Sequence, residues 1–154
     1  LAYVGDSNNN VTHSLIYGAM LAGMKIRLGC PQQTEFSPKN SIAATARRLG
    51  GDVQVFTDPV KAVTGADVVY TDSWMSYRIP SSQKTRRVKI LKPYQVTEAL
   101  MQHAKKNALF MHCLPALRGM EVTKDVIDGK QSVVFDQAEN RMHTEKAILL
   151  WLLK

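Results

Sequence analysis

The chain has 154 residues, of which 45% are hydrophobic and 21% are charged, a composition typical of one globular domain with a core. Its two cysteines, Cys30 and Cys113, are too few for a disulfide framework or a four-thiolate zinc site. No apolar run reaches the roughly 18 residues of a membrane span, and no signal peptide is evident. We therefore expect a cytoplasmic domain that contacts no membrane.

The formal net charge of +7 comes from 20 Lys and Arg residues against 13 Asp and Glu residues. A basic surface suits nucleic acid or a phosphorylated metabolite. However, the positive charge is spread along the chain, and its densest run, 84–89, lacks the aromatic residues on which single-stranded nucleic acid stacks. We interpret this run as the solvated face of a helix and expect no nucleic-acid partner.

Hydrophobic periodicity and capping signals predict alternating strands and helices. In chain order we expect a strand at 1–5, a helix at 11–24, a strand at 25–30, a helix at 38–49, a strand at 53–57, a helix at 59–65, a strand at 66–71, a polar excursion from 72 to 93, a helix at 94–106, strands at 108–112 and 132–135, and a helix at 138–153. Ser37 and Asp58, each followed by proline, are typical of helix N-caps.

Strands that alternate with helices through short connections indicate a parallel sheet with helices on both faces. The predicted fold is therefore α/β, a Rossmann-like doubly wound parallel sheet flanked by helices. Because the chain opens directly in a strand, we expect a domain from a longer polypeptide.

Polar clusters follow four of the predicted strands, at 6–10, 72–76, 112–115 and 136–141. The carboxyl ends of parallel strands meet at one edge of a sheet, where such folds bind ligands. The first cluster follows a single glycine, Gly5, and so lacks the glycine-rich turn of a dinucleotide site. It offers instead three asparagine amides beside a helix N-terminus, which would bind a carboxylate or phosphate, or cap the helix.

Residues of the next two clusters have both a chemical and a structural interpretation. Asp72, at the end of a buried strand, would bind an ammonium group or cap the next turn. His112 and Cys113 would lie on opposite faces of a strand, which argues against a nucleophile–base pair, and a lone Cys is most often a small hydrophobic residue. Pro115 is a candidate for a cis peptide bond, which would turn the carbonyls of Cys113 and Leu114 toward a ligand.

Arg141 lies near the start of the last predicted helix, where its charge opposes the helix dipole. It would bind an anion or polarise a carbonyl, or else form an ion pair with Glu139 or Glu145. No set of His, Cys, Asp and Glu residues has the spacing of a metal site, so we expect no metal.

Four motifs together resemble the second, amino-acid-binding domain of the ornithine carbamoyltransferases over essentially the whole chain. They are Gly5-Asp-Ser-Asn-Asn9, Thr71-Asp-Ser-Trp-Met-Ser76, Met111-His-Cys-Leu-Pro115 and Ala138-Glu-Asn-Arg141. The His-Cys-Leu-Pro motif is the specific one, because the aspartate-using relatives carry Pro in place of Cys. The resemblance implies transfer of the carbamoyl group of carbamoyl phosphate to the side-chain amine of L-ornithine, giving citrulline and phosphate without a cofactor.

For ornithine, the resemblance implies that Asn9 binds the carboxylate and that Asp72 and Ser76 bind the α-ammonium group, with Tyr77 in the same substrate loop. This loop departs from the family, which has Met-Gly where this chain has Tyr77-Arg78. The acceptor would otherwise be putrescine, lysine or an N-acylornithine. Asn9 and Asp72 favour an unmodified α-amino acid, so we expect ornithine to be the acceptor.

For carbamoyl phosphate, the resemblance implies binding by His112, Cys113, Leu114 and Arg141. The carbonyls of Cys113 and Leu114 would accept hydrogen bonds from the carbamoyl NH₂ group. Cys113 would also lie beside the attacking amine, as a polar neighbour or proton acceptor. Arg141 would bind the carbamoyl oxygen as negative charge develops on it.

The phosphate-binding Ser-x-Arg-Thr segment of the family's first domain is absent from this sequence. We therefore expect residues 1–154 to be the ornithine-binding domain alone, inactive by itself, from an enzyme that assembles as a homotrimer or a multiple of it. The alternative from another class is a non-catalytic ligand-binding or assembly module, in which substitution of Asp72 or Cys113 would change stability alone.

Overall fold

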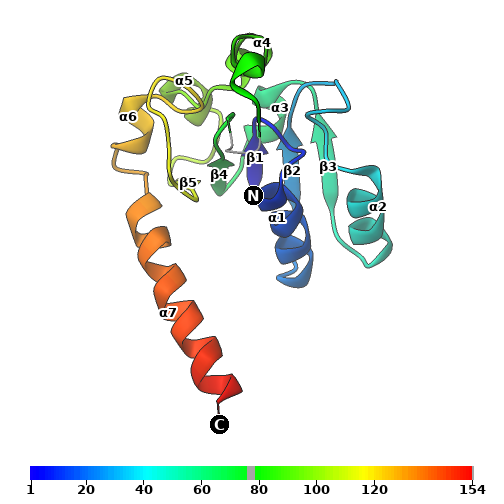
Figure 1. Cartoon of the computed structure of the whole chain (residues 1–154), viewed down its shortest axis with the longest axis vertical. Coiled ribbons are helices and arrows are strands. Elements are labelled where there is room, and N and C mark those ends of the chain that lie inside the picture. Colours follow the sequence, from blue (N-terminus) through cyan, green and yellow to red (C-terminus); the bar gives the residue numbers. More distant parts are fainter. Residues whose placement is uncertain (76–78, 154) are drawn as a thin grey trace.

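The computed structural model describes residues 1–75 and 79–153 and contains a five-stranded parallel sheet (Figure 1). The strands are β1 (Ala2–Val4), β2 (Ile26–Gly29), β3 (Val53–Phe56), β4 (Val68–Thr71) and β5 (Leu109–His112). Their order across the sheet is β3-β2-β1-β4-β5. The chain reverses its direction of travel across the sheet between β1 and β4, so a ligand crevice is expected beyond the ends of these two strands.

Helices cover both faces of the sheet. They are α1 (Asn10–Leu21), α2 (Asn40–Arg48), α3 (Pro59–Val63), α4 (Lys84–Leu91), α5 (Glu98–Met101), α6 (Lys124–Ile127) and α7 (Val134–Leu152), with 3-10 turns η1 (Ser81–Gln83) and η2 (Lys92–Tyr94). Alternate residues of β1 point to opposite faces: Tyr3 packs with Ile16 of α1 and Ala43 of α2, whereas Ala2 and Val4 pack in the core that α3, α5 and α6 complete. The predicted doubly wound α/β fold is thus confirmed.

Two of the predicted side-chain caps are found at the start of their helices, and a third predicted cap is wrong. The Asn9 side chain accepts a hydrogen bond from Thr12 N at the start of α1, and Asp58 accepts one from Val60 N at the start of α3. Ser37 does not cap α2, which begins three residues later with Lys39 at the N-cap and no side-chain bond. The Ser37 hydroxyl donates instead to the carbonyl oxygen of Pro31, at 3.3 Å.

The structure differs from the prediction in three segments. Residues 132–135 form no strand, because Ser132 makes only an isolated bridge to Phe110 and Val134 already begins α7. The predicted helix at 94–106 is only one turn long, α5, because Lys105 N then donates to the Ala66 carbonyl and the chain turns into β5. The polar excursion at 72–93 contains a helix, α4.

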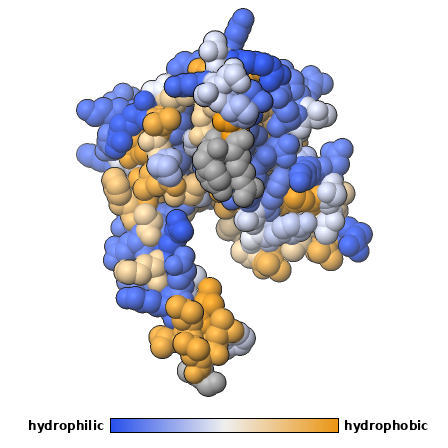
Figure 2. Space-filling view, viewed as in Figure 1, coloured by the Kyte–Doolittle hydropathy of each residue, from blue (hydrophilic) through white to orange (hydrophobic). Residues whose placement is uncertain are grey.

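Helix α7 projects away from the rest of the molecule (Figure 1). Its distal end is strongly apolar (Figure 2). Ile148, Leu150 and Trp151 are 51%, 69% and 74% exposed. Within the described residues, none of the helices, α7 included, has the length and apolar character needed to cross a membrane.

Candidate functional site

A cavity of about 430 Å³ opens at the carboxyl ends of β1 and β4, where a ligand crevice is expected. Its lining comes from the turn after β1, from α1, from the loop before α2, from the segment after β4 and from α4. The residues are Asp6, Asn8, Asn9, Asn10, His13, Glu35, Lys39, Asp72, Ser73, Ile79 and Arg87. The first two polar clusters of the sequence therefore meet in one place, as predicted.

The turn after β1 is held by its own side chains. Gly5 has φ +128°, and a Cβ there would lie 3.4 Å from Thr71 Oγ1, so glycine fits this turn best. Asn9 Oδ1 accepts from Thr12 N at 2.8 Å, while Nδ2 donates to the Tyr3 hydroxyl at 2.8 Å and to the Asp6 carbonyl at 2.6 Å. The helix-cap interpretation of Asn9 is confirmed, and its binding of a carboxylate stays a prediction.

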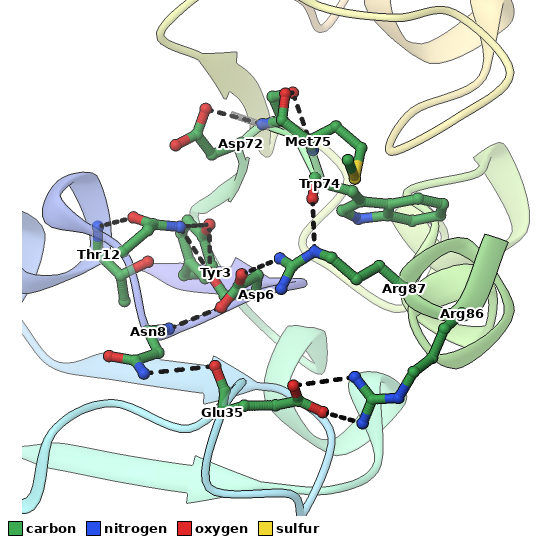
Figure 3. Close-up of polar contacts among 12 residues, drawn as sticks. Tyr3, Asp6, Asn8, Thr12, Glu35, Asp72, Trp74, Met75, Arg86 and Arg87 are labelled. Atoms are coloured by element: carbon green, nitrogen blue, oxygen red, sulfur yellow. Dashed lines mark hydrogen bonds and ion pairs between the residues drawn. The ribbon is translucent and has the colours of Figure 1, made fainter. Parts of the chain in front are cut away.

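Arg87 ties this turn to the segment after β4 (Figure 3). Its guanidinium forms an ion pair with the Asp6 carboxylate, donates from Nε to the Trp74 carbonyl at 3.0 Å, and lies 4.9 Å above the Phe36 ring. Burial raises the pKa of the Asp6 carboxyl, and the Asn8 N–H and Arg87 oppose that rise.

The interpretation of run 84–89 as a solvated helix face is wrong for this residue, because Arg87 is only 5% exposed. Neighbouring Arg86 fits that interpretation, since it is exposed and pairs with Glu35 at the surface (Figure 3). Leu91, one helical turn after Arg87, is also buried. This i, i+4 pairing with an apolar residue is the signal in the sequence that could have placed Arg87 on the inner face of α4.

Asp72 and Cys113 are in contact, although they are far apart in the sequence. Asp72 Oδ1 accepts a hydrogen bond from Ser73 N at 2.7 Å and one from the Cys113 thiol at 3.1 Å. Within residues 1–75 and 79–153, the hydrogen bonds to this carboxylate all go to Oδ1. Asp72 thus caps its own turn, and its second oxygen accepts no hydrogen bond from that part of the chain.

Burial, and then the charge of Asp72, raise the pKa of the Cys113 thiol to about 12. The thiol is therefore protonated near neutral pH and donates its hydrogen to Asp72. A protonated thiol is a weak nucleophile and cannot accept a proton. Of the two roles expected for Cys113, the geometry favours the polar neighbour.

Alkylation of Cys113 should therefore be slow near neutral pH and should quicken by about tenfold for each pH unit below the pKa of about 12, because the thiolate is the reacting form. Asp72→Asn removes a charge that raises this pKa, so alkylation should quicken by about tenfold for each unit that the pKa falls. Iodoacetamide rates followed by mass spectrometry in a Cys30→Ser background measure this. Asp67→Asn, an exposed carboxylate at the opposite end of β4, is the control, and equal rates in the two variants would contradict the assignment.

His112 is the last residue of β5, so it does not lie with Cys113 on opposite faces of one strand as predicted, and one of its ring nitrogens is within 4.8 Å of Cys113 Sγ. Its side chain is fully buried, and its Nδ1 accepts a hydrogen bond from Leu114 N at 2.9 Å. Leu114 has φ 55°, and the peptide bond to Pro115 is cis, as expected. Sequence reasoning missed Gln137, whose side chain accepts from His112 N at 3.1 Å and donates to the Tyr70 hydroxyl at 2.7 Å.

Of the remaining predicted residues, Arg141 is the one that the structure describes, and it is not joined to this cluster. Arg141 is exposed on α7, and its guanidinium lies 3.9 Å from the Glu145 carboxylate, one of the two ion pairs expected for it. Ser76 and Tyr77, and with them Arg78, lie outside the described residues.

The fold also brings together three potential metal ligands that the spacing in the sequence did not reveal. A ring nitrogen of His112, Sγ of Cys113 and a carboxylate oxygen of Asp72 lie within 4.8 Å of one another. A thiol must lose its proton to bind a metal, and the high pKa of Cys113 opposes this. The absence of a metal from this site stays a prediction.

Comparison with known proteins gives a consistent result. The model of the family "Aspartate/ornithine carbamoyltransferase, Asp/Orn binding domain" matches residues 1–152. The chain is 48% identical to the ornithine carbamoyltransferase of Clavibacter sepedonicus over 100% of its own length and 50% of the relative's. The solved ornithine transcarbamoylase of Giardia lamblia is similar with a TM-score of 0.88 and 43% identity, over 96% of this chain and 48% of that one.

The solved ornithine carbamoyltransferase of Pyrococcus furiosus is similar with a TM-score of 0.86 and 46% identity, over 96% of this chain and 47% of that one. The chain thus spans about half the length of the curated relatives it matches.

Proposed function

Because this chain belongs to the aspartate/ornithine carbamoyltransferase family as its Asp/Orn binding domain, we propose that it is the ornithine-binding half of an ornithine carbamoyltransferase. The complete enzyme would transfer the carbamoyl group of carbamoyl phosphate to the side-chain amine of L-ornithine, releasing citrulline and phosphate. The observation that carries the proposal is the contact of Cys113 with Asp72, which lines the cavity at the ends of β1 and β4.

In the proposed complex, Asp72 binds the α-ammonium group of ornithine through Oδ2, which has no hydrogen-bond partner within residues 1–75 and 79–153. Asn9, beside the N-terminus of α1, lies where a carboxylate is stabilised by the helix dipole. Ser76 and Tyr77 belong to the adjoining segment and complete the amino-acid site.

In the proposed reaction, the neutral side-chain amine attacks the carbamoyl carbon, the bond from that carbon to the phosphate oxygen breaks, and the proton that the amine loses passes to the departing phosphate. Partial burial of the site favours the neutral form of the amine. The carbonyls of Cys113 and Leu114 hold the carbamoyl NH₂ group. Arg141 stabilises the oxygen on which negative charge develops, and most of the rate comes from that charge and from holding two substrates together.

The proposed enzyme needs a second half that supplies the phosphate site, which agrees with the half-length match to the relatives. The apolar end of α7, exposed in this chain, would pack against that half and bring Arg141 to the substrates. We also propose that the parent enzyme is cytoplasmic and assembles as a homotrimer or a multiple of it.

The test is an assay of ureido product with carbamoyl phosphate in the complete polypeptide, with ornithine, putrescine, lysine and N-acetylornithine as acceptors. Turnover confined to ornithine, and absent from residues 1–154 alone, is the expected result. Turnover with another amine would mean that Tyr77 and Arg78 have changed the pocket. No turnover with any acceptor would overturn the proposal in favour of a non-catalytic binding or assembly module.

A further inference from the structure

A buried pair of ionisable side chains lies directly behind the Cys113–Leu114 segment. His112 and Glu121 are each 0% exposed, and His112 Nε2 lies 3.5 Å from Glu121 Oε1. The same Glu121 oxygen accepts a hydrogen bond from Leu117 N at 2.6 Å. Because Nδ1 of His112 accepts from Leu114 N, the hydrogen of the neutral ring is on Nε2, which faces Glu121.

His112 holds the N–H of one peptide plane. The Leu114 N–H and the Cys113 carbonyl belong to the same planar peptide unit and point in opposite directions. When His112 Nδ1 holds the N–H, it directs the Cys113 carbonyl away from the buried pair. The left-handed backbone of Leu114, at φ 55°, is unfavourable for a residue with a side chain and needs surrounding contacts to hold it.

Glu121 lies outside the motif and contacts His112, the residue that holds the Leu114 N–H. Its carboxylate faces Nε2 of His112 and also holds the N–H of Leu117, so it links the start and the middle of the loop that follows β5. The backbone of Glu121 is itself fixed, because its carbonyl accepts from Val96 N at 2.9 Å.

Neither His112 Nε2 nor Glu121 Oε2 has a hydrogen-bond partner among the described residues. An incompletely satisfied buried pair contributes little to stability, and apolar residues of similar size would serve as well for that purpose.

We propose that Glu121 is a positioning residue for carbamoyl phosphate. It fixes the tautomer and the ring orientation of His112, and His112 in turn orients the Cys113 carbonyl toward the carbamoyl NH₂ group. The inference rests on the proposed function. His112 then acts behind the substrate rather than in contact with it, and the direct contact with the carbamoyl group is made by the backbone.

The experiment compares Glu121→Gln with the wild type in the complete polypeptide. Glutamine keeps the shape and an oxygen for Leu117 N but removes the charge that faces Nε2 of His112. The KM for carbamoyl phosphate should rise, or kcat fall, by roughly tenfold to hundredfold, while the KM for ornithine stays within about twofold of the wild type because Asp72 and Asn9 are untouched. Glu98→Gln, an exposed glutamate on α5, is the matched control and should change neither constant.

A second measurement separates positioning from stability and does not depend on activity. Nitrogen-15 NMR of the histidine ring and of the Leu114 amide should report a changed tautomer balance and a shifted amide resonance in Glu121→Gln, with the far-ultraviolet circular dichroism unchanged. If Glu121→Gln fails to fold, Glu121→Asp replaces it, because a shorter carboxylate keeps the charge and lengthens the contact with His112.

Unchanged His112 and Leu114 resonances, together with unchanged kinetic constants, would overturn the positioning role even in an active enzyme. An inactive wild-type polypeptide would instead overturn the proposed function, and the NMR arm would still decide whether Glu121 orients the peptide.

Discussion

Replacing Arg87 with leucine should lower the free energy of unfolding by about 3–5 kcal/mol, because it leaves the Asp6 carboxylate buried without its cation. Arg87 and Asp6 side chains are 6% and 10% exposed, so water cannot replace the lost partner. The variant also frees the Trp74 carbonyl, which Arg87 binds through Nε. Urea unfolding followed by circular dichroism or fluorescence measures the change.

The matched control for this prediction is the adjacent residue. Arg86 pairs with Glu35 at the surface, where its side chain is 56% exposed, so Arg86→Leu should leave the free energy of unfolding nearly unchanged. A double variant, Asp6→Leu with Arg87→Leu, should recover part of the loss, because no charge then stays buried. Equal destabilisation by Arg86→Leu and Arg87→Leu would show that the buried ion pair is not what holds the two loops together.

Asp72→Asn should raise the KM for ornithine in the complete enzyme by about two orders of magnitude, the effect of losing a charged hydrogen bond of about 3 kcal/mol. Asparagine keeps an oxygen for Ser73 N and for the Cys113 thiol, so the turn itself should survive. Steady-state kinetics with both substrates varied measures the effect, and the KM for carbamoyl phosphate should change less.

Asp67→Asn is the control for the loss of one negative charge beside β4. Asp67 precedes the same strand at the opposite edge of the sheet and pairs with Lys105 in solvent, so its substitution should leave both KM values unchanged. If Asp72→Asn lowers only the melting temperature and leaves turnover intact, Asp72 is a cap alone and the binding-module alternative gains support.

The order of elements was largely predictable because the strands have strong local signals. The β-branched run before Asp72 became β4, and the segments at 25–30 and 53–57 contain β2 and β3. Membership of the family was also predictable from four short motifs, and the family comparison confirms it. The predicted strand at 132–135 was wrong because the segment pairs with β5 only through the bridge of Ser132 to Phe110 before α7 begins at Val134.

The site was predictable only in part. The meeting of the clusters after β1 and β4 follows from the topology of parallel sheets. The role of Arg87 was not predicted, because Arg87 belongs to a run of basic residues. Glu121 is a single acidic residue in the loop between β5 and α6, and no local pattern distinguishes it. Their partners, Asp6 and His112, are brought to them only by the tertiary fold.

The ion pair between Asp6 and Arg87 joins residues 81 positions apart. During synthesis on a ribosome, Asp6 in the turn after β1 is made before Arg87. Arg87 follows only after four strands and three helices have been synthesised. Contacts between such distant positions form slowly, because a long loop must close before they stabilise anything. The turn after β1 is therefore expected to be among the last parts of this domain to reach its final conformation.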